Sequence, residues 1–258
     1  MSGNPGRDPV FRMMAAAEKA MVRGRHARAA ALYSQLIAGA GAGHPAKDKL
    51  ATCHLNRGFC LRALKRQGDA LNDYARSSQL NPLSFKPHLN AALIHAQDFE
   101  RYPQAVVEFD KALALHPTCT EALSSRGLTK MLMADLQGAR DDLEAALSIE
   151  PDDPDTLCNL GNLYAQEGQL DKAASTYKRA LQTNPCDAEI RYNLALALMR
   201  MGAQNAADAV LREDRKAVRL WRQKGRPLTP GRAGCLLNSL ILLLVTLLAA
   251  FSAITVLS

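Results

Sequence analysis

The residue types that most often carry chemistry are scattered along this chain without a recognisable catalytic or metal-binding spacing. The six cysteines form no CxxC pair and show no ligand-like spacing with the six histidines. GxSxG, GxxxxGK[ST], HExxH and GxGxxG contexts are missing as well. The acids Asp152, Asp153 and Asp155 precede a predicted helix, where N-capping accounts for them. We therefore expect no enzyme activity, no metal and no cofactor.

Positive charge is concentrated near the C-terminal end of the sequence. The formal net charge is +7, and residues 212–232 hold eight Lys or Arg against two acids, so 8 − 2 = +6 of it lies there. A nucleic-acid binder is expected to carry its basic surface on the folded body, so we expect no nucleic-acid partner. The cluster either contacts anionic lipid or acts as a topology signal on a solvated helix face. The candidate lipid contacts are Arg215, Lys216, Arg219, Arg222 and Lys224.

The elements that would position any site recur along the chain at a nearly constant interval. Small residues lie at Ala70, Ala105, Ala139, Ala173 and Ala207, with spacings of 35, 34, 34 and 34. Prolines and bulky residues repeat in phase with them: Pro82, Pro117, Pro151, Pro185, and Tyr74, Phe109, Leu143, Tyr177, Leu211. Aromatic residues are only 5% of the chain, and no alternating apolar pattern argues for strands. Stacked pairs of helices are therefore predicted.

The stretch from Asp153 to Asp187 resembles one complete tetratricopeptide repeat, a 34-residue pair of antiparallel helices. The resemblance rests on Leu157, Leu160, Gly161, Tyr164, Gly168, Ala173, Tyr177, Ala180 and Pro185. We expect Gly161 and Ala173 to be small because the two helices cross there closely. The resemblance implies an all-α fold, a right-handed α-solenoid. The apolar residues 235–257 beyond the repeats predict, separately, a single transmembrane helix after it.

The predicted organisation follows the repeat phase, and Leu93 replaces the glycine of the other repeats in the third copy. A loose terminus, residues 1–9, is followed by a repeat-like unit at 10–43 and a linker at 44–50. The later units are expected at 51–84, 85–119, 120–153, 154–187 and, as a degenerate capping repeat, 188–225, followed by a linker at 226–234.

Residues 235–257 differ from everything before them. The 23 residues from Cys235 to Leu257 contain no charge and would span about 34 Å as a helix, against a hydrocarbon core of about 30 Å. Such a segment behind a soluble domain resembles tail-anchored membrane proteins, and the preceding basic residues favour a cytosolic repeat domain. Cys235 is a candidate for palmitoylation. The endoplasmic reticulum or secretory pathway is favoured over the mitochondrial outer membrane, by resemblance.

A tetratricopeptide array resembles scaffolds that bind a protein or peptide in a groove lined by the first helix of each repeat. The groove positions implied here are Phe59, Arg62, Asn90, Gln97, Met131, Asn162, Gln166, Tyr192 and Arg200. Chaperone-binding relatives of this kind use lysines, an arginine and two asparagines to hold an acidic peptide terminus. Asn56 fits one asparagine, whereas Met14, Glu18, Pro87 and Ala91 occupy positions of the others.

The sequence therefore predicts a membrane-anchored adaptor that binds a protein partner on the cytosolic face of a membrane. Two alternatives stay open. One is a soluble structural subunit of a larger assembly, ciliary or cytoskeletal for instance, whose apolar segment packs on a partner. The other is an Hsp70 or Hsp90 cochaperone, which the missing clamp residues disfavour.

Overall fold

The described part of the chain consists of helices joined by short turns. The computed structural model describes residues 9–39 and 47–212 and divides the chain into two compact units, Met1–Pro117 and Thr118–Ser258. Unit 1 holds α1 (Pro9–Val22), α2 (His26–Ala38), α3 (Lys47–Ala63), α4 (Gln67–Leu80), α5 (Lys86–Leu93), η2 (Ile94–Asp98) and α6 (Tyr102–Leu115). Unit 2 holds α7 (Thr120–Leu132), α8 (Leu136–Ile149), α9 (Pro154–Gln166), α10 (Leu170–Thr183), α11 (Ala188–Arg200) and α12 (Gln204–Arg212).

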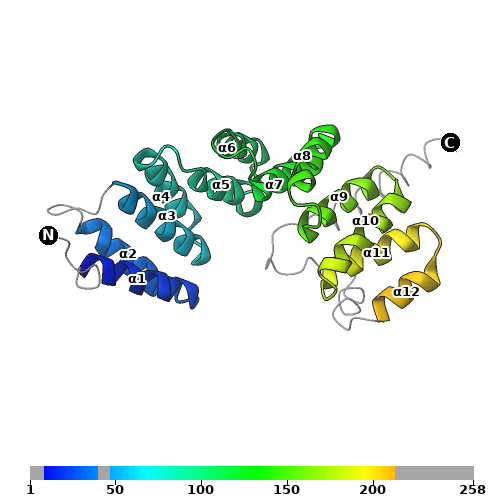
Figure 1. Ribbon diagram of the computed structural model, residues 1–258, viewed down its shortest axis with the longest axis horizontal. Helices are drawn as coiled ribbons and strands as arrows, with labels where there is room; N and C mark the ends of the chain where they lie inside the picture. The colour runs from blue at the N-terminus through cyan, green and yellow to red at the C-terminus, as the bar shows by residue number, and fades with distance from the viewer. Residues whose placement is uncertain (1–8, 40–46, 213–258) are drawn as a thin grey trace, which may run out of the picture. The chain divides into compact units, whose positions relative to one another are not determined.

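Within each unit, every helix packs against the next one along the chain (Figure 1). Alternate helices also touch, as α7 does α9 and α9 does α11. This is the arrangement of a repeat solenoid, in which each helix pair is stabilised mainly by its neighbours. The predicted all-α solenoid is confirmed for the described residues.

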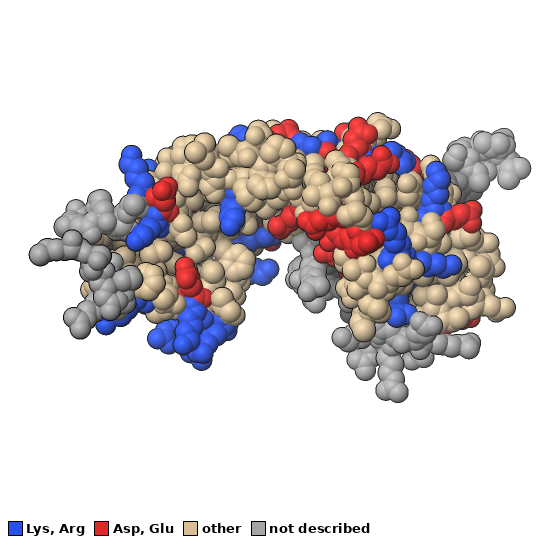
Figure 2. Space-filling view, in the orientation of Figure 1, with Lys and Arg blue, Asp and Glu red and all other residues tan. Residues whose placement is uncertain are grey.

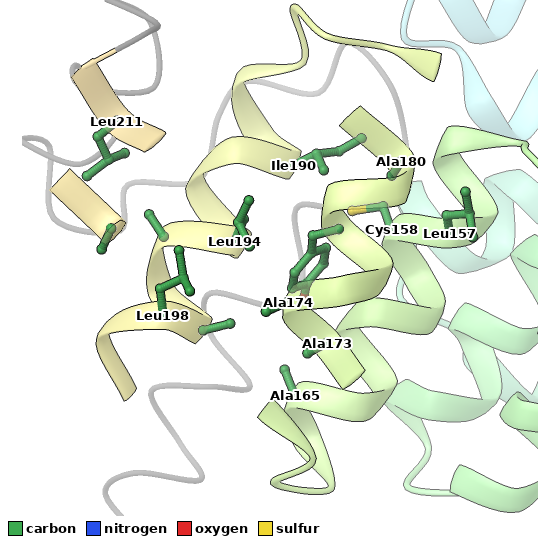
Figure 3. Close-up of a cluster of buried hydrophobic side chains, with 14 residues drawn as sticks. Leu157, Cys158, Ala165, Ala173, Ala174, Ala180, Ile190, Leu194, Leu198 and Leu211 are labelled. Atoms are coloured by element: carbon green, nitrogen blue, oxygen red, sulfur yellow. The ribbon is translucent and has the colours of Figure 1, made fainter. Parts of the chain in front are cut away.

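The repeating small and bulky residues form the core, as their spacing predicts. The crossing alanines, from Ala29 and Ala70 to Ala207, are all fully buried. Tyr33, Tyr74, Phe109, Leu143, Tyr177 and Leu211 are buried beside them. Figure 3 shows the cluster of unit 2, where Leu157, Ile190 and Leu194 from α9 and α11 surround the alanines of α10. These clusters exclude water along each unit and hold the helix pairs in register.

Position 161 requires a glycine, but not because two helix backbones approach closely there, as predicted. The nearest atoms belong to an aromatic side chain. A Cβ built on Gly161 would lie 2.5 Å from Cε1 of Tyr177, and one on Gly58 would lie 2.6 Å from Cε1 of Tyr74. The glycines therefore make room for an aromatic ring of the second helix. In the fourth repeat Leu143 takes the place of that ring. A Cβ built on Gly127 would lie 3.0 Å from Cγ of Leu143.

The third repeat contains one additional residue, and a π-helix accommodates it. In the second and fourth repeats the amides of Arg66 and Asp135 donate to carbonyls five residues earlier, Leu61 and Lys130. In the third repeat the amide of Arg101 donates to His95, six residues earlier, directly after η2. A π-turn absorbs a single inserted residue without breaking the helix. The 35-residue spacing between Ala70 and Ala105 thus has a local structural cause. Because the additional residue falls after Leu93, the buried Ala92 and not Leu93 takes the place of the glycine in the third copy, so that prediction is wrong.

The observed helix bounds differ from the prediction at the start of α3 and test it only in part at α12. Helix α3 begins at Lys47, so residues 47–50 are helical and do not belong to the predicted linker at 44–50. Asp48 in the first turn is favourable at a helix N-terminus, which helps to explain the earlier start. In the degenerate sixth repeat, α12 is described up to Arg212, and Ala207 and Leu211 are buried against α11. Its predicted continuation to about Lys224 lies outside the described residues.

Candidate protein-binding groove

The first helices of the repeats carry the predicted groove residues. In unit 1 these are Phe59 and Arg62 on α3, Asn90 on α5 and Gln97 in η2. In unit 2 they are Met131 on α7, Asn162 and Gln166 on α9, and Tyr192 and Arg200 on α11. The two sets lie in different compact units of the chain.

Arg62 is the centre of the unit 1 set. Its Nε donates to Asp98 Oδ2 at 2.8 Å, and its Nη2 donates to Gln97 Oε1 at 2.6 Å. Arg62 and Gln97, predicted to line the groove independently, therefore touch each other across neighbouring repeats. Asp98 was not predicted; its position beside Gln97, which lies one 35-residue repeat after Arg62, is the signal that could have found it. Both side chains of the Arg62–Asp98 pair are about one-fifth exposed, 24% and 17% respectively.

An exposed aromatic residue lies one helical turn before Arg62. The side chain of Phe59 is exposed, at 47%, although it is large and apolar. Its ring meets the ring of His26 edge-to-face, with the centroids 6.0 Å apart. Asn90 is half-buried on α5, the first helix of the following repeat. Aromatic residues, including phenylalanine, and arginine are both enriched in protein interfaces.

In unit 2 the predicted residues separate into buried and accessible ones. Met131 and Asn162 are each 1% exposed, so neither side chain is available to a ligand on the surface. The prediction that they line the groove is therefore wrong for these two residues. Met131 packs in the core with Leu143 and Leu163. Asn162 Oδ1 accepts hydrogen bonds from Tyr177 Oη at 2.6 Å and from Asn193 Nδ2 at 3.2 Å.

Gln166, Tyr192 and Arg200 remain at least partly accessible in unit 2. Arg200 is exposed and its Nη1 donates to the carbonyl of Ala165 at 3.1 Å, near the C-terminal end of α9. A cation there is favourable for the helix dipole and satisfies one of the last carbonyls. The Oε1 atom of Gln166 is buried and has no hydrogen-bond partner among the described residues. Burial raises the pKa of the half-buried Tyr192.

The asparagines that recur on the first helices link neighbouring repeats. Asn56 Nδ2 donates to Tyr33 Oη at 3.1 Å, and Asn159 Nδ2 donates to Ser124 Oγ at 3.1 Å. Asn193 reaches Asn162 in the same way. Each of these asparagines therefore reaches the preceding repeat. Asn56, the residue that fits the asparagines of the chaperone-binding relatives, is half-buried and already donates a hydrogen bond to the preceding repeat.

A second polar series braces the two helices of individual repeats. Arg57 Nη2 contacts Asp73 Oδ1 at 2.7 Å, and His88 Nδ1 contacts Glu108 Oε2 at 2.7 Å. In the fourth repeat Arg126 Nη2 contacts Asp142 Oδ1 at 2.6 Å. Burial alone would raise the pKa of Asp73, but hydrogen bonds from Arg57 and His54 outweigh it and hold the pKa below its usual range. The ionised carboxylate thus contributes stability above its unfolded pKa that is lost as the pH falls through the folded pKa.

The pKa of Glu189 in α11 is shifted upwards, whereas that of Asp73 is shifted downwards. Burial, together with the nearby carboxylates of Asp187 and Asp155, raises the pKa of Glu189 to about 7. A raised folded pKa contributes stability below the unfolded pKa, and this is lost as the pH rises towards about 7. We expect Glu189→Gln to stabilise unit 2 relative to wild type by about 1 to 2 kcal/mol at pH values above about 8, and little below about pH 4.

Urea unfolding at both ends of this pH range measures the difference. Glu121→Gln, at an exposed glutamate in the first turn of α7, is the matched control and should change little at either pH. An equal effect of Glu189→Gln at low and high pH would contradict the assignment.

Among residues 9–39 and 47–212, no group of three or more His, Cys, Asp or Glu could hold a metal ion. In the same ranges, none of the helices is both long and apolar enough to cross a membrane. The free cysteines include buried Cys53 and Cys60, and burial raises the pKa of each thiol to about 11. The predicted lipid contacts from Arg215 to Lys224, the predicted palmitoylation site Cys235 and the predicted membrane helix at 235–257 all lie outside the described residues.

Comparison with known proteins supports the same class of fold. Family models match residues 130–179, described as a tetratricopeptide repeat, and residues 161–202, described as a TPR repeat. A solved tetratricopeptide repeat protein from Parabacteroides merdae has a TM-score of 0.66 at 16% identity, over 79% of this chain and 78% of that chain. The fold is therefore that of a tetratricopeptide-repeat solenoid, and residues 130–202 carry such repeats.

Two curated relatives show how far sequence similarity extends. The peroxisomal targeting signal receptor of Eremothecium gossypii is 27% identical over 183 residues, which is 70% of this chain and 30% of the receptor. Intraflagellar transport protein 70A2 of Mus musculus is 33% identical over 150 residues, 54% of this chain and 22% of that protein. The chain thus spans less than a third of the length of either relative.

Proposed function

We propose that this protein is an adaptor that binds a protein or peptide partner along the first helices of its repeats. The observation that carries the proposal is the exposed Phe59 beside the half-buried Arg62–Gln97–Asp98 cluster in unit 1. An aromatic ring held outside the core carries a free-energy cost that a partner would remove by covering it. The hydrogen bonds fix the neighbouring guanidinium, so little side-chain entropy is lost when a ligand contacts it.

Replacing Phe59 by glutamate tests the groove in the intact protein. Proximity labelling with the wild-type protein identifies its neighbouring proteins. We expect Phe59→Glu to reduce the labelling of those that bind the groove about tenfold or more, since a charge there opposes burial of an apolar ligand. Val107→Glu is the matched control: Val107 is 51% exposed on α6, a second helix of the same unit, and should leave labelling unchanged. Equal losses with both variants, or none with Phe59→Glu, would refute the groove.

We further propose that residues 235–257 anchor the repeats to a membrane, with the endoplasmic reticulum as the expected location. The support is the 23-residue uncharged stretch behind a basic cluster. Alkaline carbonate extraction of the full-length protein should leave it in the membrane pellet, and a chain truncated before Cys235 should be released. Release of the full-length chain would reject the anchor, and imaging of the tagged protein beside endoplasmic-reticulum and mitochondrial markers tests the location.

The second candidate is a soluble structural subunit of a larger assembly. The similarity to an intraflagellar transport protein over 54% of this chain favours it. In that case the apolar stretch would pack against a partner protein, and the full-length chain would leave membranes in carbonate. The same extraction experiment therefore separates the two candidates.

A further inference from the structure

Three arginines occupy equivalent positions in the three consecutive repeats of unit 1. Arg25, Arg66 and Arg101 are the N-cap residues of α2, α4 and α6, the second helices of their repeats. Their backbones match closely, with φ and ψ of −84° and 57°, −105° and 59°, and −91° and 68°. Each arginine follows a residue with positive φ, which is Gly24, Lys65 or Glu100. One turn geometry thus presents three arginines along one edge of the unit.

An arginine is an unusual choice at this position. The N-terminus of a helix carries partial positive charge and favours an anionic or small polar cap. None of the three arginines makes a side-chain capping hydrogen bond, whereas in unit 2 Asp135 caps α8 by accepting from the amide of Gly138 at 3.0 Å. In unit 1 the side chains at this position therefore supply no acceptor to balance the positive potential of the helix ends.

Three further cations lie close to Arg25 in the sequence. Lys19, Arg23 and Arg28 flank Arg25, and all are exposed and form no ion pair among the described residues. Figure 2 shows Lys and Arg gathered over the end of unit 1 where α1 joins α2. Arg66 pairs with Asp69 of its own first turn at 2.7 Å, in an exposed i, i+3 contact that an incoming anion can replace.

An exposed apolar side chain accompanies each of the three arginines. Val22 is 83% exposed, Leu64 is 38% exposed and Phe99 is 37% exposed. The guanidinium carbon of Arg101 lies 4.9 Å from the centroid of the Phe99 ring, so the arginine is stacked on the ring. The edge therefore combines a row of cations with apolar contacts at the repeat interval.

We propose that this edge, defined by Arg25, Arg66 and Arg101, binds an acidic peptide segment with interspersed apolar residues, separately from the groove. Charge complementarity indicates the sign of the partner. The repetition of arginine and apolar residue from repeat to repeat favours an extended chain that crosses the three turns, because a lipid surface would need no such register. The surface lies on the intra-repeat turns and consists of different residues from the groove, although the two adjoin where Phe59 meets His26, the residue after Arg25.

The chain itself offers a neutral substitution for the test. Gln169 occupies the same N-cap position before α10, with φ of −81° and ψ of 63°. The triple variant Arg25→Gln, Arg66→Gln, Arg101→Gln should therefore fold like wild type, as checked by circular dichroism. The matched control is Lys47→Gln, Lys49→Gln, Lys86→Gln, which removes the same charge from exposed positions at the N-terminal ends of α3 and α5.

The binding experiment uses the full-length protein in neutral detergent and a fluorescein-labelled peptide that alternates glutamate pairs with leucine. We expect binding that weakens with salt, about a tenfold loss in the arginine triple variant, and less than a twofold loss in the lysine control. A twin peptide with glutamine in place of every glutamate should not bind. Equal losses in both triple variants, no binding of the acidic peptide, or binding only to micelles that contain phosphatidylserine would overturn the proposal.

Discussion

Replacing Tyr177 by alanine is expected to lower the free energy of unfolding of unit 2 by about 3 to 5 kcal/mol. The Tyr177 side chain is 1% exposed and lies against Gly161, so its removal leaves a cavity between α9 and α10. Its hydroxyl donates to Asn162 Oδ1 at 2.6 Å, which links it to the interhelical hydrogen bond from Asn193. Loss of the ring therefore affects the interface of two repeats, and neighbour coupling carries the loss through the unit.

Urea unfolding followed by circular dichroism measures this change, and hydrogen exchange locates it in α9–α11. Tyr177→Phe is the matched variant, since it keeps the ring and removes only the hydroxyl. It should cost about 1 kcal/mol, because Asn162 retains its bond from Asn193. If Tyr177→Ala cost no more than Tyr177→Phe, the packing role of the ring would be disproved.

The second large effect is expected at Asp142 of α8, where replacement by alanine should destabilise unit 2 by about 3 to 5 kcal/mol. The Asp142 carboxylate accepts two hydrogen bonds from Arg126, at 2.6 and 2.8 Å, and contacts Lys130 Nζ at 2.9 Å. Its side chain is only 6% exposed, while those of Arg126 and Lys130 are 19% and 21% exposed. Removing the carboxylate leaves two cations close together in a partly desolvated site.

The ion pair of Arg179 with Asp152 provides a control within the same unit. Their side chains are 47% and 70% exposed, so Asp152→Ala should change the free energy of unfolding by less than about 1 kcal/mol. Both variants are compared by urea unfolding at neutral pH and low salt. Similar losses for Asp142→Ala and Asp152→Ala would show that burial does not decide the strength of these pairs.

Much of the fold could be predicted because its causes are local and periodic. Prolines at Pro82, Pro117, Pro151 and Pro185 each follow a helix that ends two residues earlier, because the proline ring disfavours the helical conformation at the residue before it. The crossing alanines are buried because only a small side chain fits where helices meet. Periodicity placed the helix pairs, yet it could not foresee that η2 would absorb the additional residue of the third repeat, since a turn, a loop or a π-helix could each have done so.

The candidate groove was harder to predict, because one residue of register on a helix turns a side chain by a large angle. Asn162 and Arg62 were assigned to the same surface by analogy, but Asn162 is buried by Tyr177 and Asn193 while Arg62 is partly exposed. Which polar side chain meets which partner depends on the neighbouring repeat, as the contact of Arg62 with Asp98 shows.

The sequence by itself determined the repeat, its phase, its core alanines and the unusual apolar character of residues 235–257, because these depend on residue type and spacing alone. Only the tertiary structure decided that Gly161 makes room for the Tyr177 ring, that Asn56, Asn159 and Asn193 link neighbouring repeats, and that arginines repeat at one edge of unit 1. The physical reason is that these properties arise between segments, where burial and hydrogen-bond geometry depend on how two helices meet.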